Sequence, residues 1–146
     1  MSFTLEVPRE YGYILAVATA SIFVNTAHKT LTSITRKASG VPYPNSYATK
    51  EEIERNPAAL KFNLAQRSHA NFTENYGPFV TALLVAGLGY PSQAKWAGSA
   101  WVAGRLLYMF GYTNFGPPGR LYGYVISQLG KMALTTMAVL TCWNML

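Results

Sequence analysis

The charged residues of this chain are confined to short stretches that separate long uncharged runs. The four longest runs without a formal charge are residues 11–28, 75–94, 106–119 and 132–146. Crossing a bilayer takes about 20 mostly apolar residues. Two of the runs nearly reach that length alone, and the other two reach it if each helix also carries a charge. The four spans predicted from this distribution are about 10–35, 62–90, 93–115 and 121–145.

Composition and turn-forming residues agree with this pattern. Half of the 146 residues are hydrophobic and 12% are charged, about half the usual share of roughly 25% in soluble domains. Glycine and proline interrupt the chain at residues 40–44, 89–91 and 116–119. The alternative is a soluble four-helix bundle, but each of its helices should have a polar face, and residues 132–146 have almost none.

We therefore predict an all-α fold, an integral membrane four-helix bundle formed by one domain over residues 1–146. Loops rich in Lys and Arg stay in the cytosol, and the loop from Arg36 to Lys61 holds five of the twelve basic residues. This loop is predicted to be cytosolic, with both termini on the far side. The residues from Thr49 to Glu52 resemble a capping box, which predicts a short surface helix. The tryptophans expected near span ends are Trp96, Trp101 and Trp143.

The second predicted span carries polar side chains on two faces. At about 100° per residue, Arg67, Asn71 and Glu74 fall on one stripe, whereas His69 lies roughly 200° from Arg67. Ionisable groups inside a membrane are costly unless they face protein or water, so each one is a functional hypothesis. Two polar faces suggest that one meets the helices of its own chain and the other meets a second copy of the protein.

The third predicted span also carries a polar stripe. Its members, Arg105, Tyr108 and Tyr112, share one face of a helix. Two hydroxyls and a guanidinium can serve one buried anionic ligand. Alternatively, the tyrosines are core or interface aromatics and Arg105 pairs with Glu74, which would offset the cost of burying either charge. We expect the Arg105–Glu74 pair, and it is compatible with a ligand site.

Arg120 follows a Gly-Pro-Pro-Gly sequence and opens the fourth span. Helix N-termini and arginines both favour anions, although an ordinary arginine at the membrane surface is the alternative interpretation. Lys131 and Gln128 lie deeper, and we interpret them as satisfied polar packing. The whole inventory fits a small water-soluble ligand with at least two anionic groups and one amine. The chain has no Asp and one Cys, which excludes a Ser/His/Asp triad and a cysteine metal cluster.

Four segments carry a resemblance to a known family. The sequences FNLAQRSHANFTENYGPF at residues 62–79 and GRLLYMFGY at residues 104–112 resemble motifs of the membrane-associated proteins in eicosanoid and glutathione metabolism. The segments EYGY at residues 10–13 and YPNSY at residues 43–47 are similar to its type 3 microsomal glutathione transferase branch. The resemblance covers nearly the whole chain.

The resemblance implies a homotrimer of four-helix protomers, with one glutathione held at each subunit interface. Glutathione has two carboxylates, one ammonium and one thiol, which fits the ligand deduced above. The glutathione contacts implied by motif position are Arg36, Arg67, His69, Asn71, Glu74, Tyr108 and Tyr112. Of these, Arg36 and His69 match positions contributed by the neighbouring subunit, and Glu74 is expected on the ammonium. Arg120 looks like the catalytic arginine that stabilises the glutathione thiolate.

The implied activity is glutathione transfer to lipophilic electrophiles, together with glutathione-dependent reduction of lipid hydroperoxides. No metal and no nucleic acid is implied. We expect the endoplasmic reticulum membrane, with the outer mitochondrial membrane as the alternative, and an active site that faces the cytosol. A non-catalytic lipid-binding scaffold of the same family would lose the thiolate arginine and weaken the glutathione contacts. A small transporter would place its polar groups at the bilayer midplane.

Overall fold

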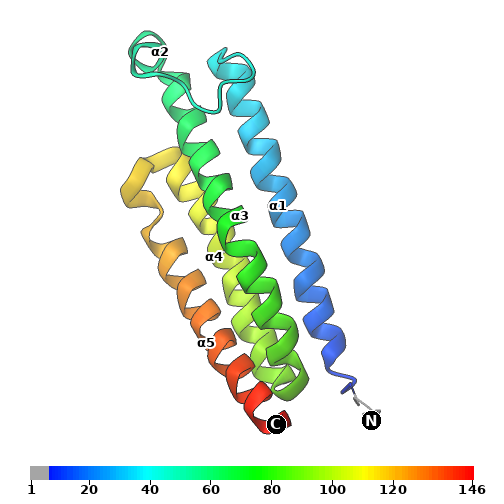
Figure 1. Ribbon diagram of the computed structural model, residues 1–146. Helices are drawn as coiled ribbons and strands as arrows, with labels where there is room; N and C mark the ends of the chain where they lie inside the picture. Colours follow the sequence, from blue (N-terminus) through cyan, green and yellow to red (C-terminus); the bar gives the residue numbers. More distant parts are fainter. Residues whose placement is uncertain (1–6) are drawn as a thin grey trace.

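The computed structural model describes residues 7–146, which form five α-helices (Figure 1). The helices are α1 (Tyr11–Ser39), α2 (Lys50–Arg55), α3 (Pro57–Gly89), α4 (Pro91–Gly119) and α5 (Leu121–Met145). No strand occurs within the described residues, so the all-α prediction is confirmed. The four long helices correspond to the four predicted spans, and the short α2 corresponds to the predicted surface helix.

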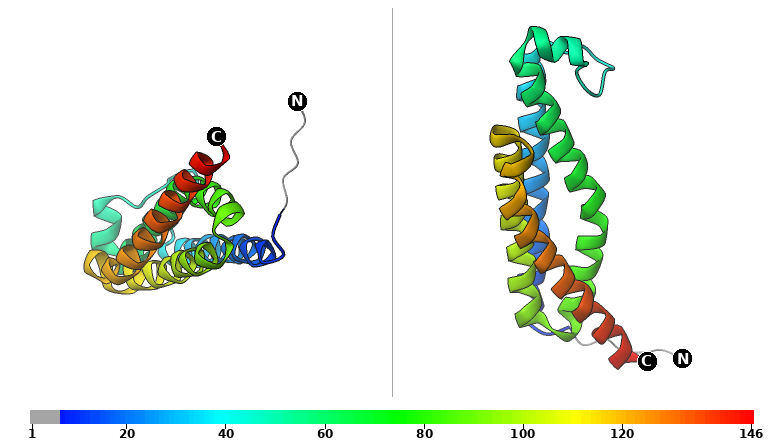
Figure 2. Two further views of the ribbon diagram at one scale, coloured as in Figure 1. Left: turned by 90° about the horizontal axis from the view of Figure 1, so that it is seen from below. Right: turned by 90° about the vertical axis from the view of Figure 1, so that its left-hand side faces the viewer.

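The four long helices lie side by side and alternate in direction, as Figures 1 and 2 show. Helices α1 and α5 each pack against both α3 and α4. The α1–α3 connection and the α4–α5 turn lie toward one end of the molecule, which we call the loop end. The start of α1 and the α3–α4 turn lie at the opposite end. Each long helix therefore brings one terminus to each end.

Local capping explains where α1 ends and where α2 begins. Gly40 adopts a left-handed conformation (φ 73°), and its N–H donates to the carbonyl of Arg36 at 3.1 Å. Glycine tolerates this conformation at no steric cost, which makes it a common helix terminator. The Thr49 hydroxyl accepts from the Glu52 N–H at 3.2 Å, and the Glu52 carboxylate accepts from the Thr49 N–H at 2.7 Å. The predicted capping box is confirmed.

Helix α3 begins five residues before the predicted boundary at residue 62. The side-chain oxygen of Asn56 accepts from the N–H of Ala58 at 3.0 Å, and Pro57 occupies the first helical position. Both residues suit a helix start, since asparagine satisfies an otherwise unpaired donor and proline has none to satisfy. Lys61 separates this first turn from the residues that follow, so the predicted span, which starts at residue 62, left the turn out.

Small residues allow α4 and α5 to approach closely. A methyl group built on Gly104 would meet the Ser127 nitrogen at 2.7 Å and the Gly123 carbonyl oxygen at 2.9 Å. Such backbone proximity is typical of helices that pack in membranes. The turn between the two helices begins at Gly116, whose backbone angles (φ 71°, ψ −160°) break the helix, near the predicted end at residue 115.

The core between α1, α3 and α4 is aromatic. Trp101 is fully buried and stacks on Phe79, with ring centroids 3.6 Å apart. The prediction that Trp101 lies at a span end is therefore wrong: it points inward from the middle of α4, where a large ring fills the space between helices. Trp96 and Trp143 are 71% and 76% exposed and lie near helix ends, as predicted.

Among the described helices, α5 is the one that is long and apolar enough to cross a membrane by length and composition. Helices α1, α3 and α4 are longer but include more charged and polar side chains. A membrane-spanning role for these three stays a prediction from the pattern of uncharged runs.

Candidate functional site

Helices α3, α4 and α5 enclose a pocket of about 460 Å³, within the usual range of roughly 300–1,000 Å³ for small-molecule sites. Its lining residues are Asn71, Tyr108, Pro117, Pro118, Arg120, Leu121 and Tyr124. Three predicted site residues therefore meet in one pocket: Asn71 from α3, Tyr108 from α4 and Arg120 from the junction of α4 and α5. The pocket lies at the α4–α5 turn, toward the loop end of the molecule.

Arg120 lies between α4 and α5, at the point where α5 begins. Its side chain is exposed, and the guanidinium carbon lies 5.2 Å from the centroid of the Tyr112 ring. Tyr112 in turn meets Tyr108 edge-on, with centroids 5.6 Å apart, and both tyrosines are buried. The two rings form a rigid wall behind a cation that is open to a ligand, at a helix terminus that favours anions.

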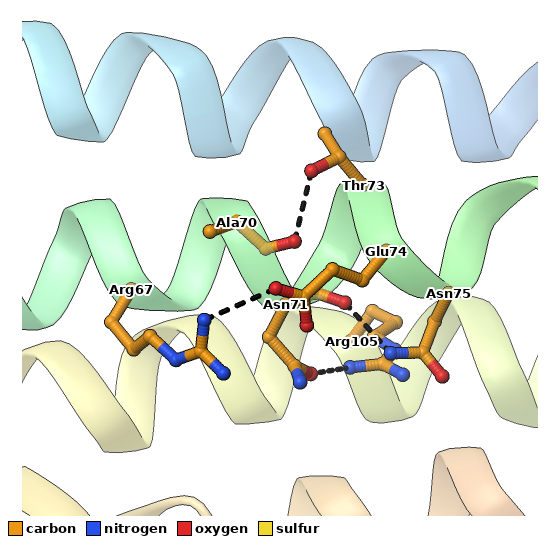
Figure 3. Close-up of polar contacts among 7 residues, drawn as sticks. All are labelled: Arg67, Ala70, Asn71, Thr73, Glu74, Asn75 and Arg105. Carbon is orange, nitrogen blue, oxygen red and sulfur yellow. Dashed lines mark hydrogen bonds and ion pairs between the residues drawn. The ribbon is translucent and has the colours of Figure 1, made fainter.

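Arg67 and Glu74 form an ion pair on α3, two helical turns apart. The Arg67 Nη1 atom lies 3.1 Å from Glu74 Oε1, and Figure 3 shows the two side chains reaching toward each other along the helix. The prediction that Glu74 pairs with Arg105 is therefore wrong. Both members of the observed pair are about half exposed, at 49% and 52% of their side-chain surface. A ligand can therefore reach both side chains and replace their contact with each other.

Arg105 is buried, and it contacts Asn71 instead of Glu74. Its Nη1 atom donates to the Asn71 side-chain oxygen at 2.7 Å (Figure 3), and its guanidinium lies 5.2 Å from the Trp101 centroid and 5.5 Å from the Tyr108 centroid. With its oxygen engaged, Asn71 is left with its amide N–H groups to offer the pocket. Arg105 thus fixes the orientation of a pocket residue, in keeping with a structural role.

Lys131 and Gln128 lie on α5 behind the pocket. The Lys131 ammonium donates to the side-chain oxygen of Asn75 at 2.7 Å, which confirms its interpretation as satisfied polar packing. Gln128 donates to the Tyr124 hydroxyl at 3.3 Å, but its own side-chain oxygen is buried without a hydrogen-bond partner in the described part of the chain. Gln128 is therefore only partly satisfied.

Of the seven predicted glutathione contacts, only Asn71 and Tyr108 line this pocket. Arg67, Glu74 and Tyr112 lie on α3 and α4 outside the lining, and Arg36 and His69 have other surroundings. Arg36 donates to the carbonyl of Asn45 at 2.8 Å, and its guanidinium lies 4.4 Å from the ring centroids of both Tyr43 and Phe62. This arrangement fixes the arginine against the loop that follows α1. Within the single chain, Arg36 therefore contacts its own loop and not the pocket wall.

His69 faces α1, on the side of α3 away from Arg67. Its ring lies 3.3 Å from the side-chain oxygen of Asn25, measured from Nε2, and stacks on His28 with centroids 6.1 Å apart. The predicted division of α3 into two polar faces is confirmed, since Arg67 and His69 have separate surroundings. The face holding His69 packs on α1 of its own chain.

The pocket also contains residues that the sequence interpretation missed. Tyr124 lies one turn after Arg120, at a spacing of four residues that puts both on one face of α5. That spacing was visible in the sequence. Pro117 and Pro118 were interpreted only as helix breakers, whereas in the structure they close one side of the pocket.

A comparison with known protein families supports the resemblance drawn from the motifs. The model of the MAPEG family, the membrane-associated proteins in eicosanoid and glutathione metabolism, matches residues 14–140. The match covers α3 and α4 in full, most of α1 and α5, and every residue that lines the pocket. Members of this family are membrane-associated, and they include glutathione transferases and peroxidases as well as non-catalytic proteins. This chain belongs to the MAPEG family.

Proposed function

We propose that the protein is a glutathione transferase with glutathione peroxidase activity, similar to the type 3 microsomal branch of its family. The observation that carries the proposal is the convergence of Asn71, Tyr108 and Arg120 on one pocket, with the Arg67–Glu74 pair on the same helix as Asn71. Cations, an amide and hydroxyls are suitable partners for the carboxylates and thiolate of glutathione. The Glu74 carboxylate suits its ammonium.

The proposed role of Arg120 is to hold glutathione as a thiolate. A free thiol has a pKa near 8.5 and is mostly protonated at neutral pH, whereas the thiolate is the nucleophile. A guanidinium beside the sulfur favours the charged form, and its effect grows where water is partly excluded. Tyr108 and Tyr112 exclude water on one side of Arg120. The lipophilic electrophile would enter from the lipid, and glutathione from the aqueous side.

The proposed active assembly is a homotrimer in the endoplasmic reticulum membrane, with the active site facing the cytosol. In the single chain, the Arg67–Glu74 pair is half exposed, and Arg36 lies against its own loop. A neighbouring subunit that supplied Arg36 and His69 would complete a site between two chains. The mass of the purified protein in detergent tests this assembly, because a monomer would contradict a shared site.

The test of function uses purified protein in detergent micelles. Glutathione binding is measured by calorimetry, and turnover is measured with an aryl halide and with a lipid hydroperoxide. We expect wild-type protein to bind glutathione and to turn over at least one of the two substrates. We expect Arg120→Ala to keep most of the binding while losing turnover, because Arg120 acts on the sulfur and the other contacts hold the peptide.

Two results would overturn the proposal. Wild-type protein that binds no glutathione would exclude the enzyme hypothesis and favour the lipid-binding scaffold. Equal turnover by wild-type and Arg120→Ala protein would remove the proposed catalytic residue. Lys37→Gln serves as the matched control, since this exposed lysine lies near the same end of the molecule but outside the pocket.

A further inference from the structure

A groove with both polar and apolar lining lies between the starts of α1 and α4, at the end of the molecule opposite the proposed glutathione pocket. One part, of about 380 Å³, is lined by Tyr13, Ala16, Val17, Ala20, Lys95, Trp96 and Ser99. An adjoining part, of about 600 Å³, is lined by Arg9, Glu10, Gly12, Tyr13 and Ala16. The two parts adjoin at Tyr13 and Ala16, and we call them together the groove. Neither part includes a residue of the proposed glutathione pocket.

The mouth of this groove combines cations with exposed aromatic rings. The Lys95 ammonium lies 4.8 Å from the Tyr13 centroid and 5.4 Å from the Trp96 centroid. The two rings are 59% and 71% exposed. Tyrosine and tryptophan are enriched where a membrane protein meets the headgroup layer. A lysine fixed between two such rings is therefore positioned at headgroup depth.

The interior of the groove differs from its mouth. Ala16, Val17 and Ala20 on α1 and Ser99 on α4 leave a shallow, open channel of small side chains beside the rings, and Ala16, Ala20 and Ser99 are exposed. From Tyr13 to Ala20 this wall extends about 10 Å along the helix axis. A channel of this kind accommodates a section of hydrocarbon chain, but it offers few groups to a soluble polar ligand.

Charge complementarity indicates the headgroup. Arg9 and Lys95 contribute two positive charges and Glu10 one negative charge, so the mouth carries one net positive charge. A phosphate diester carries one negative charge and accepts hydrogen bonds from an ammonium. We propose that this groove binds one phospholipid of the surrounding membrane, with its phosphate on Lys95 and one acyl chain along Ala16 and Ala20.

The test compares two lipids that differ in their headgroup phosphate. Purified protein in detergent is titrated with phosphatidylglycerol or with diacylglycerol carrying the same acyl chains, and retained lipid is counted by native mass spectrometry. We expect wild-type protein to retain one phosphatidylglycerol and to release diacylglycerol. Lys95→Gln should weaken retention about fivefold, the usual contribution of one lysine at an anionic surface.

A second variant addresses the chain-binding part of the groove. Ala20→Phe fills the channel and should weaken retention about tenfold, the loss expected when two methylene groups lose their contact. Lys37→Gln removes the same charge as Lys95→Gln from the far end of α1 and should retain lipid like wild type. Glutathione binding is also measured on the Lys95→Gln and Ala20→Phe proteins. Binding equal to that of wild type shows that both variants are folded and that the groove acts independently of the glutathione pocket.

Three results would overturn the inference. Equal retention of the two lipids by wild-type protein would exclude phosphate recognition. Equal losses in Lys95→Gln and Lys37→Gln would show attraction to the overall charge instead of a site. Unchanged retention by Ala20→Phe would show that no chain occupies the channel.

Discussion

Replacing Gly123 with alanine should force α4 and α5 apart. A Cβ atom on Gly123 would lie 2.6 Å from the carbonyl oxygen of Gly104 and 2.6 Å from the Cα atom of Tyr108, whereas ordinary contacts of this kind begin at 3.4 Å. The obstructing atoms belong to the backbone of a packed helix, so they cannot rotate away as a side chain can. The two helices must therefore separate by several tenths of an ångström.

The size of the effect follows from two opposing contributions. Adding a methylene-sized group to a packed interior costs about 1–3 kcal/mol, and the upper end applies because the obstruction at Gly123 is backbone. Alanine is favoured over glycine within a helix by about 1 kcal/mol. The net loss of unfolding free energy is about 2 kcal/mol, which corresponds to a fall in Tm of roughly 4–8 °C for a chain of this size.

The assay is thermal unfolding of the purified protein in one detergent at one scan rate, followed by tryptophan fluorescence. Gly12→Ala is the matched control, because no atom lies within 4 Å of a methyl group at that position. Its unfolding free energy should equal that of wild type or exceed it by up to about 1 kcal/mol, because the methyl group meets no obstruction and alanine is favoured over glycine in a helix. A Tm for Gly123→Ala equal to or above that of wild type would refute the close packing of α4 on α5.

Two further substitutions probe the site and the core. Glu74→Gln removes the ion pair with Arg67, and because the pair is half exposed stability should change by less than about 1 kcal/mol. Glutathione affinity measured by calorimetry should nevertheless fall about tenfold, since the ligand ammonium loses a charge-assisted hydrogen bond. Trp101→Ala leaves a cavity beside Phe79 and should lower the unfolding free energy by about 3–5 kcal/mol, measured by chemical denaturation.

Each of these predictions has a control with the same chemical change elsewhere. Glu54→Gln removes a carboxylate whose only ion pair in residues 7–146 is an exposed one with Lys50 at 4.0 Å, and it should leave glutathione affinity unchanged. Equal affinities for Glu74→Gln and wild type would exclude Glu74 from the binding site. Trp143→Ala removes a ring that is 76% exposed. A loss of stability as large as that of Trp101→Ala would contradict the core assignment.

The positions of the long helices could be predicted because glycine and proline interrupt the sequence where the helices end. Gly40 and Gly116 both adopt positive φ values in the structure. Gly116 follows the predicted end at residue 115, whereas α1 continues to Ser39, four residues beyond the predicted end at residue 35. The start of α3 was missed because Lys61 separates its first turn from the rest of the predicted span, whereas the Asn56 cap sets the actual helix start. Trp101 was misplaced because a tryptophan in an apolar run suits a membrane surface or a core equally well.

The pocket could be predicted only in part. The stripe containing Arg67, Asn71 and Glu74 follows from helical spacing, as does the position of His69 on another face. The partner of Glu74 could not be predicted in this way, because the choice between Arg67 and Arg105 depends on how far α3 is shifted along α4. In the structure Arg105 lies level with Asn71, which leaves Glu74 to the arginine on its own helix.

The ionisation of bound glutathione tests the role of Arg120 most directly. Thiolate absorbance of saturated protein is recorded from pH 5 to pH 9, about the range over which a thiol with a lowered pKa would titrate. A guanidinium beside the sulfur lowers the pKa of the thiol, so wild-type protein should retain thiolate at pH 7 and lose it only in more acidic solution. In Arg120→Ala protein the thiol should titrate near the ordinary pKa of about 8.5. Identical titration curves for the two proteins would contradict the assignment of Arg120 as the residue that activates glutathione.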